Sequence, residues 1–239
     1  LATSSAASDV YKRQALSFAD DLERNAAWHK NHPAYIQGER QITHGELLQR
    51  AKKLGSALHK TGVRNADRVG VLAMNSIEYG EIIAANQYAG FILSTVNFRL
   101  APAEMAWIIN DSSPKVLFFE KQYQNHLEQI REQLTSIDTY VCMDGEVDWA
   151  ISYTAFIATG DEQGPPCRAK EEDIFCLIYT SGTTGRPKGC IWGHREMRQL
   201  MQVDAWLADM QQADRALIVM PMFHLGGLVI AVSYTHLTL

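Results

Sequence analysis

The chain has 239 residues, 46% of them hydrophobic, and a net charge of −5 from 22 Lys and Arg against 27 Asp and Glu. A mildly acidic chain without a basic run is not typical of proteins that bind nucleic acid or anionic membranes. Its longest apolar stretch, residues 225–232, is far shorter than the ~18 residues needed for a transmembrane segment. The four cysteines lack zinc-ligand spacing. We therefore expect a cytoplasmic protein with reduced thiols and no metal site among these residues.

The first part of the chain alternates predicted strands and helices. Thr43 and Glu46 form a capping box that opens a helix with Leu47, Ala51 and Leu54 on its apolar face. A strand pair is expected before this helix, and a further helix is expected between the strands at 90–96 and 115–120. The other expected elements are strands at 68–73, 90–96, 115–120 and 139–143, and helices at 77–88, 124–134 and 149–157. Alternating β and α units predict an α/β fold with largely parallel sheets flanked by helices.

The second part is organised around one glycine-rich segment. A strand is expected at 173–178, a helix at 194–210 and a last strand at 216–220. The segment 159–172 combines Pro165, Pro166 and a run of charges. It is either a subdomain junction or an ordinary exposed connection, and the length of the chain allows one large domain or two small ones.

The segment 179–189 reads Y-T-S-G-T-T-G-R-P-K-G. Glycines let a backbone approach phosphate closely, hydroxyl groups donate hydrogen bonds, and a lysine adds positive charge. The segment is not a Walker A loop, because Pro187 precedes Lys188 and Gly189 follows it, and it lacks the G-x-G-x-x-G spacing. The alternative to a phosphate-binding loop is a solvated linker.

Residues 177–188 resemble, without a gap, the AMP-binding signature of the adenylate-forming enzymes. The segment 97–100 (N-F-R-L) followed by Glu104 resembles the acyl-CoA synthetase branch of this superfamily, and residues 221–227 (P-M-F-H-L-G-G) resemble its aromatic–histidine motif. The resemblance implies that residues 15–231 are part of the large N-terminal domain of such an enzyme.

The activity implied by the resemblance is an acid–thiol ligase that uses ATP, CoA and a carboxylic acid. The implied phosphate-binding residues are Thr180, Ser181, Gly182, Thr183, Thr184, Gly185 and Lys188. His224 and Lys188 are the implied catalytic residues, and the Mg²⁺ ligand is expected downstream of this chain. A domain that loads a carrier protein and an inactive nucleotide-binding homologue are the alternatives.

Other residues near these motifs are weaker candidates. Trp192 and His194 follow the signature, and His194 is also placed to begin the next helix. Asn97 and Arg99 are better explained by a structural turn. Arg186 is expected to point to solvent.

Both ends of the chain have an unusual coding relation. Residues 4–14 back-translate to DNA whose reverse complement, in another frame, encodes residues 232–239. Such termini resemble translated sequencing adapter, so we expect residues 1–14 and 232–239 to be non-native. The remainder is expected to be an inactive piece of a longer enzyme.

Overall fold

The computed structural model describes residues 17–180, 186–211 and 214–236, without the side chains of residues 234 and 236. The helices are α2 (Phe18–Trp28), α3 (His44–Lys60), α4 (Ile77–Ala89), α5 (Pro102–Ser112), α6 (Gln124–Glu128), α7 (Tyr153–Ala158), α8 (His194–Leu207) and α9 (Leu225–His236). The strands are β1 (Pro33–Gln37), β2 (Arg40–Thr43), β3 (Arg68–Leu72), β4 (Ile92–Thr95), β5 (Val116–Phe119), β6 (Thr139–Cys142), β7 (Ile151–Ser152), β8 (Ile174–Thr180) and β9 (Lys188–Gly193).

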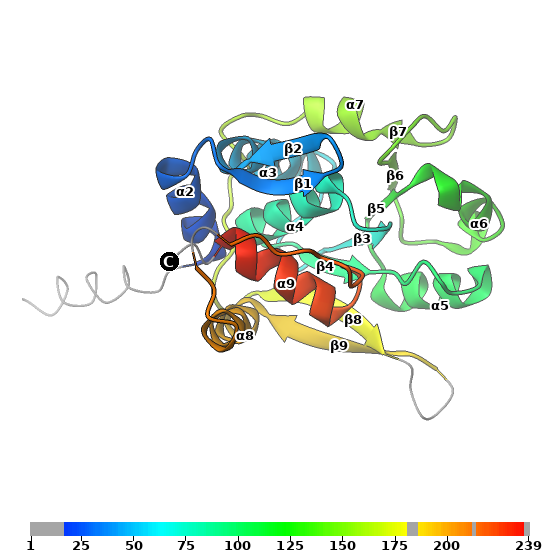
Figure 1. Cartoon of the computed structure of the whole chain (residues 1–239). Coiled ribbons are helices and arrows are strands. Elements are labelled where there is room, and N and C mark those ends of the chain that lie inside the picture. The colour runs from blue at the N-terminus through cyan, green and yellow to red at the C-terminus, as the bar shows by residue number, and fades with distance from the viewer. Residues whose placement is uncertain (1–16, 181–185, 212–213, 237–239) are drawn as a thin grey trace, which may run out of the picture.

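The strands form two sheets. The first is the antiparallel pair of β1 and β2, as expected before α3. The second has seven strands in the order β7-β6-β5-β3-β4-β8-β9, and only β9 runs antiparallel to its neighbour. β8 and β9 lie side by side at one edge (Figure 1). The predicted α/β fold with a largely parallel sheet is confirmed.

The large sheet is covered by helices on both faces. Successive residues of a strand point to opposite faces, and Val116 and Phe118 of β5 enter one core whereas Leu117 and Phe119 enter another. The first core is completed by α2, α3, α4, α7, α8 and α9, and the second by α5 and α6. Burial on both faces explains why the strands are continuously apolar rather than alternating.

The local signals around α3 act as predicted. The Thr43 side chain accepts the Glu46 N–H, and the Glu46 carboxylate accepts the Thr43 N–H. Leu47, Ala51 and Leu54 are fully buried. The helix ends before Gly62, whose φ of 90° suits glycine.

Three predictions of local structure were wrong. Residues 216–220 form no strand, because Leu217 and Val219 face solvent instead of a sheet. The helix expected at 149–157 begins only at Tyr153, since β7 pairs with β6 just before it. The helix expected at 124–134 ends at Glu128 and is followed by a separate 3₁₀ turn, Arg131–Gln133.

Strand β9 was not predicted at all. It contains two glycines and an exposed Ile191. No local sequence pattern predicts its pairing with β8.

The connection 159–172 packs along α3 and α4. Asp161 accepts hydrogen bonds from Ser56 and Lys60, and the Ala169 N–H donates to the Tyr88 carbonyl. Its role as a subdomain junction stays a prediction, as does the adapter origin of the termini, although residues 232–236 continue α9.

Two histidines are buried in this framework. His194 begins α8, as its position in the sequence indicated, and its ring lies between Phe18 of α2 and Phe175 of β8. Burial lowers the pKa of His194 to about 4. Burial, together with the nearby His29 and His32, also lowers the pKa of His44 to about 4.

These two groups predict acid destabilisation. The unfolded chain takes up protons on His44 and His194 near pH 6.5, whereas the folded chain takes them up only near pH 4. The free energy of unfolding therefore falls as pH is lowered between these values, by up to about 1.4 kcal/mol per pH unit for each histidine. Urea unfolding across this window measures the slope. We expect His194→Phe to remove one histidine's share, and His59→Gln, outside both clusters, to leave the slope unchanged. Equal slopes in all three proteins would contradict the assignment.

Candidate functional site

Two paired antiparallel strands, β8 and β9, flank the signature segment. Thr180 ends β8 and Lys188 begins β9, and the two residues are paired directly across the antiparallel ribbon. Ser181, Gly182, Thr183, Thr184 and Gly185 lie outside the described residues. The hairpin therefore places the first predicted hydroxyl residue and the predicted lysine side by side at the root of the signature.

A cleft of about 470 Å³ opens beside this hairpin, within the size range of small-molecule sites. It lies at the carboxyl ends of β4 and β8, which are parallel neighbours. Ligands of open α/β sheets bind at this edge. The cleft is lined by Thr95, Asn97, Leu100, Glu104, Ile108, Tyr179, Thr180, Pro187, Phe223 and His224.

His224 reaches the cleft through a separate segment of chain. The Thr95 hydroxyl donates to the Phe223 carbonyl at 2.8 Å and fixes the residue before it. The Nδ1 atom of His224 accepts the Gly226 N–H at 3.4 Å. A neutral imidazole that accepts at Nδ1 carries its proton on Nε2, so Nε2 is the atom of His224 that can donate a hydrogen bond.

Gly227 allows the sharp start of α9 after this histidine. A Cβ atom at this position would lie 2.3 Å from the Pro221 carbonyl oxygen, which is closer than real contacts allow. Gly227 is therefore required by the turn that precedes α9.

Helix α5 forms the opposite wall of the cleft. The Tyr179 hydroxyl donates to the Asp111 carboxylate at 2.6 Å, and the Trp107 ring meets the Tyr179 ring edge-on. Burial, followed by the bond to Asp111, raises the pKa of Tyr179. These contacts join the end of β8 to α5, and no sequence motif pointed to Asp111 or Trp107.

The remaining predicted residues take clear positions. Lys188 is exposed and forms no ion pair with any described residue, but it does not line the cleft. Asn97 accepts the Arg99 N–H at 2.9 Å, which is the structural turn expected there, although Asn97 also lines the cleft. Arg186 is exposed, as expected.

A family model described as AMP-binding enzyme matches residues 22–238 of the chain. The chain belongs to the AMP-binding enzyme family. It is 35% identical over 192 residues, 77% of its length, to a 3-methylmercaptopropionyl-CoA ligase of Ruegeria lacuscaerulensis, and 34% identical over 221 residues, 90% of its length, to a long-chain-fatty-acid–CoA ligase of Thermus thermophilus. It spans 36% and 40% of the lengths of these relatives.

The fold agrees with a solved member of this group. The anthranilate CoA ligase AuaEII, in complex with anthranoyl-AMP, superposes with a TM-score of 0.84 and 27% identity. The match covers 93% of this chain and 44% of that enzyme. This AMP-binding chain therefore has the architecture of the N-terminal domain of adenylate-forming enzymes.

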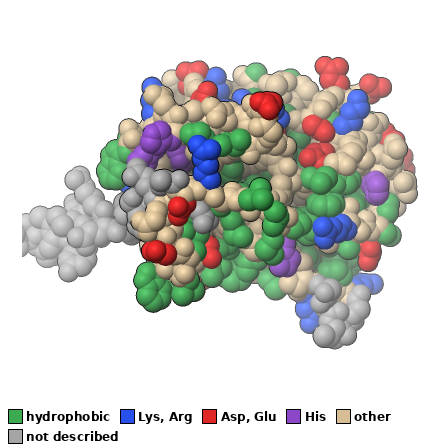
Figure 2. Space-filling view, in the orientation of Figure 1, with side chains coloured by type: hydrophobic (Ala, Val, Ile, Leu, Met, Phe, Trp, Pro, Cys, Tyr) green, Lys and Arg blue, Asp and Glu red, His purple; other side chains and the backbone are tan. Residues whose placement is uncertain are grey.

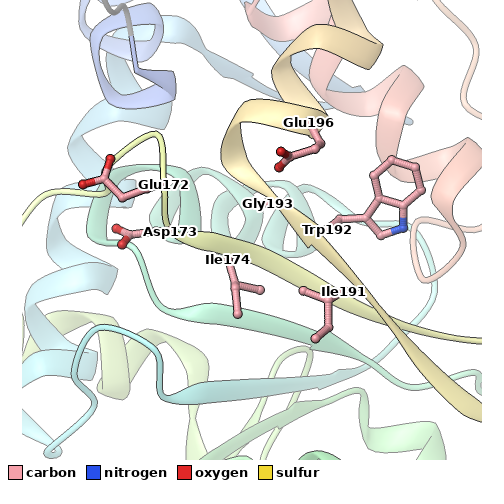
Figure 3. A pocket seen from close by; sticks show the side chains of 7 residues that line it. All are labelled: Glu172, Asp173, Ile174, Ile191, Trp192, Gly193 and Glu196. Carbon is pink, nitrogen blue, oxygen red and sulfur yellow. The ribbon is translucent and has the colours of Figure 1, made fainter.

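A second cavity of this AMP-binding chain, about 410 Å³, lies at the opposite end of the hairpin. Figure 3 shows Glu172 and Asp173 on one side of the cavity, Trp192 on the other, and Glu196 on the helix above. Ile174 and Ile191 lie between the two sides. The cavity lies at the amino end of β8, and three carboxylates repel a polyanionic nucleotide. The cavity is therefore a poor nucleotide site, and Trp192 lies away from the cleft.

Two features are absent from the part of the chain that the structure describes. No group of three His, Cys, Asp or Glu side chains there is arranged to hold a metal ion. None of the described helices combines the length and hydrophobicity needed to cross a bilayer.

The contact between Tyr179 and Asp111 predicts a measurable contribution to stability. Tyr179→Phe removes one hydrogen bond to a charged but exposed partner, so we expect a loss of about 1 kcal/mol in the free energy of unfolding. Tyr140→Phe is the matched control, because the half-buried Tyr140 hydroxyl has no hydrogen bond to a described residue. Urea unfolding of both variants measures the difference, and equal losses would show that the bond contributes nothing specific.

Proposed function

We propose that this chain is the N-terminal part of an ATP-dependent carboxylate–CoA ligase that forms an acyl-adenylate and then an acyl-CoA thioester. The observation that carries the proposal is the cleft in which Thr180, at the root of the signature hairpin, lies together with His224. The three compared proteins are named CoA ligases, and one was solved with an acyl-adenylate. Their names support the same class of reaction for this chain.

The first step joins two anions. A carboxylate oxygen of the acid bonds to the α-phosphorus of ATP, and the bond from that phosphorus to the pyrophosphate oxygen breaks. Positioning and charge neutralisation dominate the barrier of such a step. The signature segment is suited to this task because it combines hydroxyl donors, glycines and a lysine in one hairpin.

The proposed roles follow from the chemistry of each side chain. Thr180, Ser181, Thr183 and Thr184 donate hydrogen bonds to the β- and γ-phosphates, Gly182 and Gly185 let the backbone approach them, and Lys188 supplies charge from the start of β9. His224 donates its Nε2 proton to an oxygen of the acyl carboxylate or of the phosphates. Phe223 and Ile108 supply apolar surface for the acid in the same cleft.

The second step transfers the acyl group to a thiol. The thiolate of CoA bonds to the activated acyl carbon, and AMP leaves with the bond electrons. A magnesium ion would neutralise phosphate charge in the first step, but no cluster of ligands for it exists among the described residues. We therefore assign no residue of this chain to magnesium.

A pyrophosphate exchange assay tests the proposal. It uses a gene product that carries this sequence over the full length of its relatives, with fatty, aromatic and short-chain acids in separate reactions. Acid-dependent exchange supports the ligase, and CoA-dependent release of AMP separates it from a domain that loads a carrier protein. Nucleotide binding without exchange for any acid would instead identify an inactive homologue.

The two half-reactions predict a split between mutant effects. Lys188→Ala and Thr184→Ala should slow adenylate formation about 10²–10³-fold, while thioester formation from added acyl-adenylate changes far less. The physical reason is that their proposed partners, the β- and γ-phosphates, leave as pyrophosphate after the first step. Rapid-quench measurement of each half-reaction separates the two effects.

The matched controls are Lys170→Ala and Thr154→Ala, which remove the same side-chain types from exposed positions outside the cleft. Neither should change either half-reaction. Equal losses in both half-reactions for Lys188→Ala would indicate misfolding and would remove the phosphate-binding role.

A further inference from the structure

Asn75 holds the chain that leads to His224. It lies just beyond the carboxyl end of β3, before α4, and its side chain makes three hydrogen bonds to one distant backbone segment. Its amide nitrogen donates to the carbonyl oxygens of Ile218 at 3.3 Å and Met220 at 2.9 Å. Its amide oxygen accepts the Met222 N–H at 2.7 Å.

The segment held in this way is only partly fixed by burial, since Met222 is buried and Ile218 packs against the core but their neighbours are exposed. Residues 215–219 belong to no helix or strand. The Leu217 and Val219 side chains are 85% and 77% exposed, so burial does not position them. Hydrophobic side chains also gather on the surface over α9, the helix that follows this segment (Figure 2). The bonds to Asn75 satisfy backbone groups that have no partner in a helix or strand, and they contribute to the path of the segment.

A second polar anchor lies on the neighbouring strand. Thr95 ends β4, which pairs with β3 in the sheet, and its hydroxyl holds the Phe223 carbonyl. Asn75 and Thr95 together fix the backbone on the approach to His224 from two adjacent strand ends. Thr95 stands on the parallel sheet and Asn75 lies in the connection that follows β3, so the two anchors relate His224 to Thr180, which ends the next strand, β8.

We infer that Asn75 is a positioning residue for His224, and this inference rests on the proposed function of the cleft. Its amide is chemically specific for the task, because the site requires two donated hydrogen bonds and one accepted bond from a single short side chain. An aspartate of the same shape keeps the acceptor for Met222 but directs a carboxylate at the carbonyl oxygens of Ile218 and Met220. Asn75→Asp therefore removes the function of the side chain while keeping its size.

Amide hydrogen exchange on the 239-residue chain tests the structural half of the inference. We expect faster exchange at the Met222 amide in Asn75→Ala, which removes its acceptor, and a smaller increase in Asn75→Asp, whose carboxylate keeps the acceptor but repels the Ile218 and Met220 carbonyl oxygens. The Val96 amide, bonded to the Val71 carbonyl within the sheet, should keep its protection. Asn125→Asp is the matched control, since Asn125 is exposed and its side chain has no hydrogen bond to a described residue. Unchanged exchange at Met222 in both Asn75 variants would overturn the inference.

A double-mutant cycle in the ligase of full length tests the functional half. We expect Asn75→Asp to lower the adenylation rate about tenfold to a hundredfold, as misplacement of a reacting group does. The same change in a His224→Ala background should have little further effect, because its target is already absent. Additive losses would overturn the positioning role, since a general loss of stability acts in either background.

The two measurements separate this inference from the proposed function. If the unaltered enzyme shows no pyrophosphate exchange with any acid, the proposed function fails, and amide exchange alone decides whether Asn75 fixes the segment. If Asn75→Asp does not fold, Asn75→Ala and Thr95→Val carry the same cycle. Thr95→Val keeps the shape of the buried side chain and removes only its bond to Phe223.

Discussion

The parallel pairing of β4 with β8 is the constraint on which the cleft depends. It places Thr95 and Thr180 at the same edge of the sheet, although a long stretch of chain separates them. A shift of this pairing by one residue would turn the inward-facing side chains of β8 to the other face of the sheet. Phe175 and Cys176 are fully buried and Ile178 is almost so, and all three belong to the first core, whose packing holds the register.

The packed sheet and its helices differ from the segment before α9 in how they are held in place. The parallel strands and α3, α4 and α5 form the fully packed part of the molecule, where interiors resist displacement. Between α8 and α9, the Leu217 and Val219 side chains are exposed while Met222 is buried, and Asn75 and Thr95 add hydrogen bonds to the backbone of the segment. The cleft therefore takes one wall from the sheet, whereas His224 lies on a segment held by hydrogen bonds together with limited burial.

Three parts of the chain with different side-chain chemistry form the walls of the cleft. Strands β8 and β9 contribute Tyr179, Thr180 and the preceding Pro187, α5 contributes the apolar Ile108 together with Glu104, and the histidine motif contributes Phe223 and an imidazole. The carboxylate of Glu104 accepts the Ala101 N–H at the start of α5, so it serves as the cap of the helix. The cleft therefore combines apolar side chains with a few polar groups, as small-molecule sites do.

Sequence alone determined the features that depend on neighbouring residues. The capping box at Thr43, the apolar face of α3 and the turn at Asn97 rest on contacts within a few residues, and the fold class was read from the order of strand and helix patterns; the structure confirms all four. The signature and the histidine motif were recognisable as separate segments because their residue types are unusual together. Only the tertiary structure decided that Thr180 and His224 share one cleft, that β9 folds back on β8, and that residues 216–220 form no strand. Those outcomes depend on the register of the sheet and on the side chains of Asn75, Thr95 and Asp111, whose partners are distant in sequence. A local sequence pattern cannot predict these contacts, because they form only once the strands have paired.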